Sequence, residues 1–188
     1  MLQSSHEKAN ENRTKKINFA GILRKMELIK EAKAKYNAYN PEEWTKIYFD
    51  KFSGGYNVCH KGHNFSKKGG GGDAERTVGK MLAKNNGKQV EFLPESCYQK
   101  SPDINFDGKT WDIKLIDNAN EETIRNYIKD ARKADNAIFY WNTNADKLNE
   151  LISAIGRSAG YFKSKRQLNS MPDIYYMDNG ILKLLWSK

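Results

Sequence analysis

Residues 102–114 read PDINFDGKTWDIK, and this stretch carries the clearest structural signal in the chain. Asp107-Gly108 is a favoured two-residue turn, and apolar and polar residues alternate on both sides of it, so the pattern predicts a β-hairpin. Successive side chains of a strand point to opposite faces of the sheet. One face therefore carries Ile104, Phe106, Trp111, Ile113 and Leu115, and the other carries Asp103, Asn105, Thr110, Asp112 and Lys114.

The polar face of this hairpin places two carboxylates opposite each other. Asp103 is expected to face Asp112, at a Cβ separation of about 4.5–5.5 Å. Like charges at that distance are destabilising, which indicates a cation between them, and Mg²⁺ or Mn²⁺ prefers carboxylate oxygens. Lys114 lies on the same face, where it would orient an attacking water or stabilise charge on a phosphate. A solvated hairpin face would show the same pattern, and that structural interpretation stays open.

The segments around this hairpin alternate between helical and strand periodicity. The predicted elements are a helix over 73–85, a strand over 88–93, the hairpin over 103–116, a helix over 120–134, a strand over 137–141, a helix around 148–155 and a second hairpin over 173–186. The order α-β-β-β-α-β-α-β-β predicts a mixed α/β domain with helices against a central sheet.

The first predicted helix of this domain carries a glutamate on its apolar side. Glu75 shares that side with Val78 and Leu82, so it is expected to point toward the sheet. Gly79, one turn further on, would allow the helix and the sheet to approach closely. Glu75 is therefore a candidate metal ligand or water-positioning group.

The N-terminal part of the chain has a different composition. Residues 1–16 are polar and charged and are expected to be disordered, and an amphipathic helix is predicted from Asn18, followed by a short helix around Trp44. Residues 51–72 are rich in glycine and lysine and indicate a flexible linker. The expected organisation is an extension over 1–50, the linker over 51–72 and the main domain over 73–188.

The overall composition favours a polyanionic partner. Among 188 residues, 32 Lys and Arg exceed 23 Asp and Glu, which gives a formal net charge of +9. No apolar run approaches the roughly 20 residues of a membrane span, and no apolar leader is visible. Two cysteines, Cys59 and Cys97, exclude a disulfide scaffold.

The combined pattern resembles a known nuclease superfamily. Glu75 on the first helix, Pro102-Asp103 on one strand and Asp112-x-Lys114 on the next match the PD-(D/E)XK superfamily, as does the order α-β-β-β-α-β. Residues 73–142 are similar, more narrowly, to C-terminal toxin domains of bacterial contact-dependent growth-inhibition systems, several of which resemble tRNA nucleases. Asp stands at 112, where Glu is more frequent in the superfamily.

This resemblance implies a metal-dependent nuclease. Asp103 and Asp112 would bind Mg²⁺ or Mn²⁺, Lys114 would serve the attacking water, and Glu75 would assist. The expected substrate is nucleic acid, with tRNA favoured, and a cognate immunity protein would be the second partner. Such a toxin would be delivered as part of a secreted protein and would act in the cytoplasm of the cell that it enters.

Two other functions remain open at this point. One is a DNA endonuclease of phage, restriction or repair type, which would keep the same metal chemistry. The other is a catalytically inactive nucleic-acid-binding module, which would bind with a steep salt dependence and cleave nothing.

Basic residues outside the hairpin are candidates for backbone contacts with nucleic acid. Arg125, Lys129 and Arg132 form one stripe of the helix over 120–134, which an ordinary solvated helix face would also explain. The second set is Lys163, Lys165 and Arg166, next to Tyr161 and Phe162 in a segment expected to be a loop, where basic and aromatic residues suit single strands.

Three further features are weaker candidates. Cys59, His60 and His63, with Cys97 as a fourth ligand, would form a zinc site, but their spacing fits no common zinc pattern. Either histidine would alternatively serve as general acid–base in a metal-independent ribonuclease. Gly69 to Gly72 would bind a phosphate at a helix N-terminus, although a linker explains them as well. Pro172-Asp173 starts the second hairpin without a nearby acid-x-lysine pair and is interpreted as structural.

Overall fold

The protein is a mixed α/β fold built on one eight-stranded sheet. The computed structural model describes residues 3–66, 70–96, 98, 101–142 and 147–188, with side chains from residue 19 onward. The helices are α1 (Gln3–Ala38), α2 (Gly71–Asn86), α3 (Glu121–Asp130) and α4 (Leu148–Ser164), with short 3₁₀ turns η2 (Ala131–Lys133) and η3 (Leu168–Ser170). The strands are β1 (Trp44–Phe49), β2 (Tyr56–His60), β3 (Gln89–Phe92), β4 (Ile104–Phe106), β5 (Lys109–Leu115), β6 (Asn136–Tyr140), β7 (Asp173–Asp178) and β8 (Ile181–Trp186).

The strands lie in the sheet in the same order as in the chain. The pairs β1–β2, β3–β4, β4–β5 and β7–β8 are antiparallel, and each joins strands that follow one another in the chain with no helix between them. The parallel pairs β2–β3, β5–β6 and β6–β7 are each connected through a helix, as parallel strands require. The predicted mixed α/β class is therefore confirmed.

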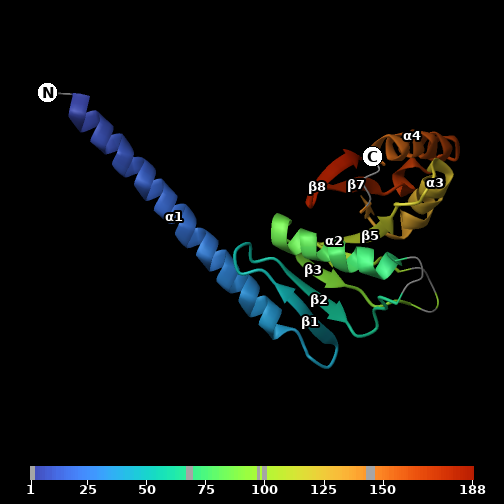
Figure 1. Cartoon of the computed structure of the whole chain (residues 1–188), viewed down its shortest axis with the longest axis horizontal. Helices are drawn as coiled ribbons and strands as arrows, with labels where there is room; N and C mark the ends of the chain where they lie inside the picture. Colours follow the sequence, from blue (N-terminus) through green and yellow to red (C-terminus); the bar gives the residue numbers. More distant parts are fainter. Residues whose placement is uncertain (1–2, 67–69, 97, 99–100, 143–146) are drawn as a thin grey trace.

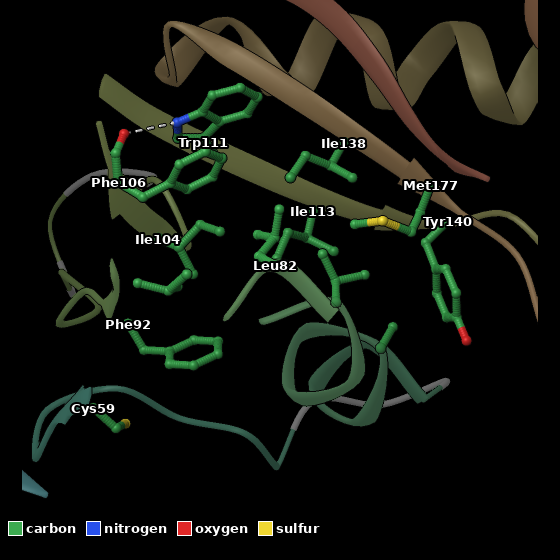
Figure 2. Close-up of a cluster of buried hydrophobic side chains, with 13 residues drawn as sticks. Cys59, Leu82, Phe92, Ile104, Phe106, Trp111, Ile113, Ile138, Tyr140 and Met177 are labelled. Carbon is green, nitrogen blue, oxygen red and sulfur yellow. Dashed lines mark hydrogen bonds between the residues drawn. The ribbon is translucent and has the colours of Figure 1, made fainter. Parts of the chain in front are cut away.

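Helices cover both faces of the sheet and create two hydrophobic cores. One core joins the apolar side of α2 to the inner residues of β3, β4 and β5, with Leu82, Phe92, Ile104 and Trp111 among its members (Figure 2). The other core joins α3 and α4 to β6 and β7. In Figure 1, α3 and α4 lie together beside the C-terminal strands, and α2 lies along a different part of the sheet.

The hairpin register predicted for residues 102–114 is confirmed. Ile104 pairs with Trp111 and Phe106 with Lys109, around a turn in which Asp107 has a φ of 53° and Gly108 a φ of 70°. Positive φ at both central residues is the requirement of the tight hairpin turn that Asp-Gly favours. Ile104, Phe106, Trp111 and Ile113 of the apolar face are buried and Leu115 is partly buried. The Trp111 indole N–H donates to the Phe106 carbonyl at 3.3 Å (Figure 2).

The N-terminal third differs from the prediction. Helix α1 begins at Gln3 and includes the segment expected to be disordered, and it projects away from the sheet in Figure 1. Strand β1 replaces the short helix expected around Trp44, because residues 44–49 pair with β2 and pack their aromatic side chains against the end of α1. The sequence did not reveal this strand, because the polar composition around Pro41 gives no strand signal. Its pairing partner, β2, lies further along the chain.

The predicted linker over 51–72 contains strand β2, which lies between β1 and β3. Val58 in β2 is fully buried, so the expected boundaries at 50 and 72 cut through the sheet. Gly55 in this segment serves close packing, since a Cβ there would lie 2.1 Å from the Ala83 carbonyl oxygen. Gly71 and Gly72 form the first turn of α2, whereas Gly69 lies outside the described residues.

Two smaller differences concern the C-terminal helix and membrane spans. Helix α4 continues to Ser164, through much of the segment from Arg157 that was expected to be a loop. Among the described helices, none combines the length and apolarity that crossing a membrane requires.

Gly79 in α2 should be the glycine at which helix–sheet packing is least tolerant. Its Cβ would lie 2.5 Å from Cζ of the fully buried Phe92 ring, so Gly79→Ala is expected to lower the free energy of unfolding by about 1–3 kcal/mol. Gly156→Ala, in open space on α4, is the control and should raise stability by about 1 kcal/mol. Urea unfolding of both variants measures the difference. Equal effects would contradict the close packing of α2.

Candidate active site

The centre of the candidate site is the buried carboxylate of Asp112. Asp112 lies between Trp111 and Ile113 in β5, so strand alternation turns its side chain away from α2 and toward the face covered by α3 and α4. Its side chain is fully buried. The Lys114 ammonium lies 2.6 Å from Oδ2, and the Lys133 ammonium lies 2.7 Å from Oδ1. One carboxylate is thus held between two cations.

Asp103 lies beside Asp112, as the hairpin register predicted. It comes directly before β4 and is buried. Its Oδ2 accepts a hydrogen bond of 2.7 Å from the Ile113 backbone N–H, and its own N–H donates to the Trp111 carbonyl at 3.0 Å. These two hydrogen bonds to β5 hold Asp103 in place beside Asp112.

Burial and mutual repulsion govern the charge of this pair. Burial, followed by the negative charge of Asp103, raises the pKa of Asp112 from 3.8 to about 6, although Lys114 and Lys133 oppose the rise. For Lys114, burial lowers the pKa, but the carboxylates of Asp112, Asp103 and Asp130 outweigh burial, and the net direction is upward. Lys114 is therefore an ammonium at neutral pH.

The donor set fits a hard divalent cation that takes few protein ligands. Both oxygens of Asp112 are buried and accept no hydrogen bond of regular geometry from the described residues, while a lysine ammonium lies within 2.7 Å of each. The protein therefore already places positive charge next to both oxygens of Asp112. Over the described ranges no three His, Cys, Asp or Glu side chains converge, so Asp103 and Asp112 would be the protein ligands, and water and phosphate would complete the shell, as is common for Mg²⁺.

Glu75 faces the sheet as predicted, but its neighbour is a histidine. Glu75 Oε2 lies 3.0 Å from His63 Nε2, and both side chains are almost fully buried. His63 Nδ1 lies 2.7 Å from the Leu93 carbonyl oxygen. Both ring nitrogens of His63 therefore face oxygen atoms, one of the Glu75 carboxylate and one of the Leu93 carbonyl.

The sheet separates this pair from Asp112. His63 packs against the ring of Phe92, which belongs to the core beneath α2. Asp112 points to the opposite face. The structure thus brings together Asp103, Asp112 and Lys114 and places Glu75 on the α2 side.

The zinc hypothesis gains no support from the described residues. His60 Nδ1 accepts from the Gly62 N–H, and the ring packs against Trp44 at 5.2 Å, so His60 and His63 have separate environments. Burial raises the pKa of the Cys59 thiol to about 11, which disfavours the thiolate that a metal requires. Cys97 lies outside the described residues.

The basic residues predicted for nucleic-acid contact fall into two groups. Arg125 forms an ion pair of 2.6 Å with Glu122, whereas Lys129 and Arg132 lie at the end of α3 and in η2. The second group lies at the end of α4 and just after it and is exposed, namely Lys163, Lys165 and Arg166.

The sequence reasoning missed one residue of this site, Lys133. Lys133 lies four residues after Lys129 and next to Arg132. The signal that could have revealed it is therefore the predicted basic stripe of the helix, which Lys133 extends by one turn. Its contact with Asp112 arises from the packing of η2 over β5, which residue spacing alone does not reveal.

A model of one known protein family matches part of the chain. Residues 100–171 match the family model of the contact-dependent growth inhibition CdiA C-terminal domain. This match covers less than half of the chain and includes Asp103, Asp112, Lys114 and Lys133, but neither Glu75 nor His63. It agrees with the resemblance to growth-inhibition domains, whereas the PD-(D/E)XK assignment stays a prediction.

Among solved structures, the chain is similar to one from the CdiA-CT/CdiI toxin and immunity complex from Burkholderia pseudomallei. The two are 18% identical with a TM-score of 0.42, and the alignment covers 61% of this chain and 83% of that chain. No curated protein matches the chain.

The raised pKa of Asp112 predicts a pH dependence of stability in metal-free protein. The folded state keeps this proton up to about pH 6, whereas the unfolded chain releases it near 3.8. The free energy of unfolding should therefore fall as pH rises through this window, by on the order of 3 kcal/mol relative to Asp112→Asn. Urea unfolding of both proteins in EDTA between pH 4 and 7 measures this difference. Parallel curves would show that Asp112 ionises normally.

Proposed function

We propose that this protein is the toxin domain of a contact-dependent growth-inhibition system and acts as a metal-dependent nuclease of the PD-(D/E)XK type. The observation that carries the proposal is the group of Asp103, Asp112 and Lys114, in which both carboxylates are buried and which lies inside the segment that matches the CdiA C-terminal family. Two carboxylates on adjacent strands beside a lysine suit phosphodiester hydrolysis, because the reaction needs positive charge at the phosphate and an oriented water.

In this proposal the reaction is water attack on phosphorus. The water oxygen forms the new bond, and the bond from phosphorus to the departing ribose oxygen breaks. Asp103 and Asp112 would hold Mg²⁺ or Mn²⁺, which would supply charge neutralisation at the phosphate and lower the pKa of water. Lys114 is an ammonium and therefore donates hydrogen bonds, so its role is to orient the water and to stabilise the developing charge rather than to accept a proton.

RNA, and tRNA in particular, is the favoured substrate because growth-inhibition domains with this resemblance are similar to tRNA nucleases. A cognate immunity protein that covers the basic surface is the expected protein partner. The site of action would be the cytoplasm of the cell into which the toxin is delivered. These three statements rest on the family match and on the net charge of +9.

Cleavage assays test the proposal with a control that the chain itself offers. Asp103→Asn, Asp112→Asn and Lys114→Gln should each lower the rate of tRNA cleavage in Mg²⁺ or Mn²⁺ by about 100-fold or more, and EDTA should abolish cleavage. Asp173→Asn is the matched control, because Asp173 also follows a proline at the start of a hairpin but lies in β7. It should leave the rate unchanged.

The substrate panel separates the remaining alternatives. Cleavage of plasmid DNA but not tRNA, with the same dependence on metal and on Asp103, would favour the DNA endonuclease. Binding without cleavage in any divalent ion would favour the inactive module. Cleavage that survives both EDTA and Asp103→Asn would refute the metal mechanism and direct attention to His60 and His63.

Metal binding has a readout that does not depend on activity. A ligand that binds only the folded state stabilises it, by about 2.7 kcal/mol at 100 times its Kd. Mn²⁺ should therefore raise the Tm of the wild type in a thermal melt, and the increase should be lost in Asp103→Asn and Asp112→Asn but kept in Asp173→Asn. An equal increase in all four proteins would show that the ion binds elsewhere.

A further inference from the structure

A basic pocket lies next to the candidate site, where η2 meets η3. Its volume is about 520 Å³. The residues that line it are Lys129, Asp130, Arg132, Lys133 and Ser170. The lining has three cations and one carboxylate, and one of the cations, Lys133, is also paired with Asp112. The Ser170 hydroxyl adds a hydrogen-bonding group. Such a lining suits a phosphate group.

Aromatic residues of α4, rather than carboxylates, hold two of these cations. The Lys129 ammonium lies 5.0 Å from the centre of the Tyr161 ring. The Arg132 guanidinium lies 5.8 Å from the Phe162 ring, and its Nε–H donates to the Lys129 carbonyl at 2.9 Å. Within the described part of the chain neither cation forms an ion pair with an acid, so both charges remain available to an anion.

Lys133 connects the pocket to the candidate site. It lines the pocket, and its ammonium also contacts Asp112 Oδ1 at 2.7 Å. An anion in the pocket and a group at Asp112 would therefore lie on either side of the same side chain. A nucleic acid backbone presents phosphates at regular intervals, which is the pattern that two adjacent phosphate positions require.

The position of these cations also has a purely structural explanation. Basic residues at the C-terminal end of a helix such as α3 complement the helix dipole. The helix dipole explains why positive charge is favourable at Lys129 and Arg132. It does not account for their contacts with aromatic rings or for the contact between Lys133 and a buried carboxylate.

Tyr161 adds an aromatic surface beside the pocket. The residue is 40% exposed although its ring contacts Lys129. Exposed aromatic rings beside cations bind unpaired bases by stacking, whereas paired bases in a duplex do not present their faces.

We propose that the pocket of Lys129, Arg132, Lys133 and Ser170 binds a backbone phosphate next to the scissile one, and that Tyr161 stacks on an unpaired base of the same strand. The substrate class is then a single-stranded or loop segment of nucleic acid, which runs from β5 across η2 toward η3. This inference rests on the proposed nuclease function and specifies where its substrate lies.

Binding measurements on the Asp103→Asn protein test this inference without relying on cleavage. The probes are a single-stranded oligoribonucleotide and the fully paired duplex of the same sequence, each titrated over a series of salt concentrations. Lys129→Ala and Arg132→Ala, added to Asp103→Asn, should weaken binding of the single strand and reduce the slope of its salt dependence by about 0.7 for each cation removed. Tyr161→Ala should weaken it by at least about fivefold, as expected for one stacked base, while Tyr161→Phe should not.

Lys84→Ala, added to Asp103→Asn, is the matched control for loss of charge, because Lys84 is an exposed lysine in the last turn of α2 and lies outside the pocket. A loss confined to the pocket variants and to the single strand supports the proposal. Pocket variants that bind like the Lys84→Ala control, or losses that are equal for single strand and duplex, overturn it. Neither of these results would affect the cleavage assays, so failure of this inference and failure of the nuclease proposal are distinguishable.

Discussion

A fully buried carboxylate between two lysine ammonium groups is the constraint on which the rest of this site depends. Removing one partner of a buried ion pair costs about 3–5 kcal/mol, because the remaining charge stays away from water. Lys114 and Lys133 supply the positive charge that stabilises an ionised Asp112 in the centre of β5. The packing of η2 over the sheet therefore depends on the charge of Asp112 in β5, which pairs with Lys133 of η2.

The sheet distributes the ionisable groups between its two faces. Asp103, Asp112 and Lys114 form a charged group toward α3, whereas His63 and Glu75 form a buried pair under α2. The backbone connects them, since the Leu93 carbonyl contacts His63 and the Leu93 N–H donates to the Asp103 carbonyl. A change in the His63–Glu75 pair would therefore reach Asp103 through the β3–β4 pairing rather than through direct side-chain contact.

Elements that depend on interactions between residues close in sequence were predicted correctly, whereas elements that depend on partners far along the chain were not. The hairpin over 102–114 depends on a two-residue turn and on alternation within thirteen positions, and its register was correct. Strands β1 and β2 depend on pairing partners elsewhere in the chain, and both were misjudged, one as a short helix and the other as linker. Glycine in the 51–72 segment suggested flexibility, although Gly55 is there because the Ala83 carbonyl leaves no room for a Cβ.

Local chemistry was sufficient to bring Asp103 and Asp112 together, because a tight turn determines which residues of its two strands face each other. Only the tertiary structure determined that this pair is buried, that Lys133 joins it, and that Glu75 pairs with His63. Each of these facts depends on how helices pack on a sheet, which joins residues 12 to 21 positions apart in these contacts. Periodicity within a segment indicates which face is buried, but not which side chain from another segment will cover it.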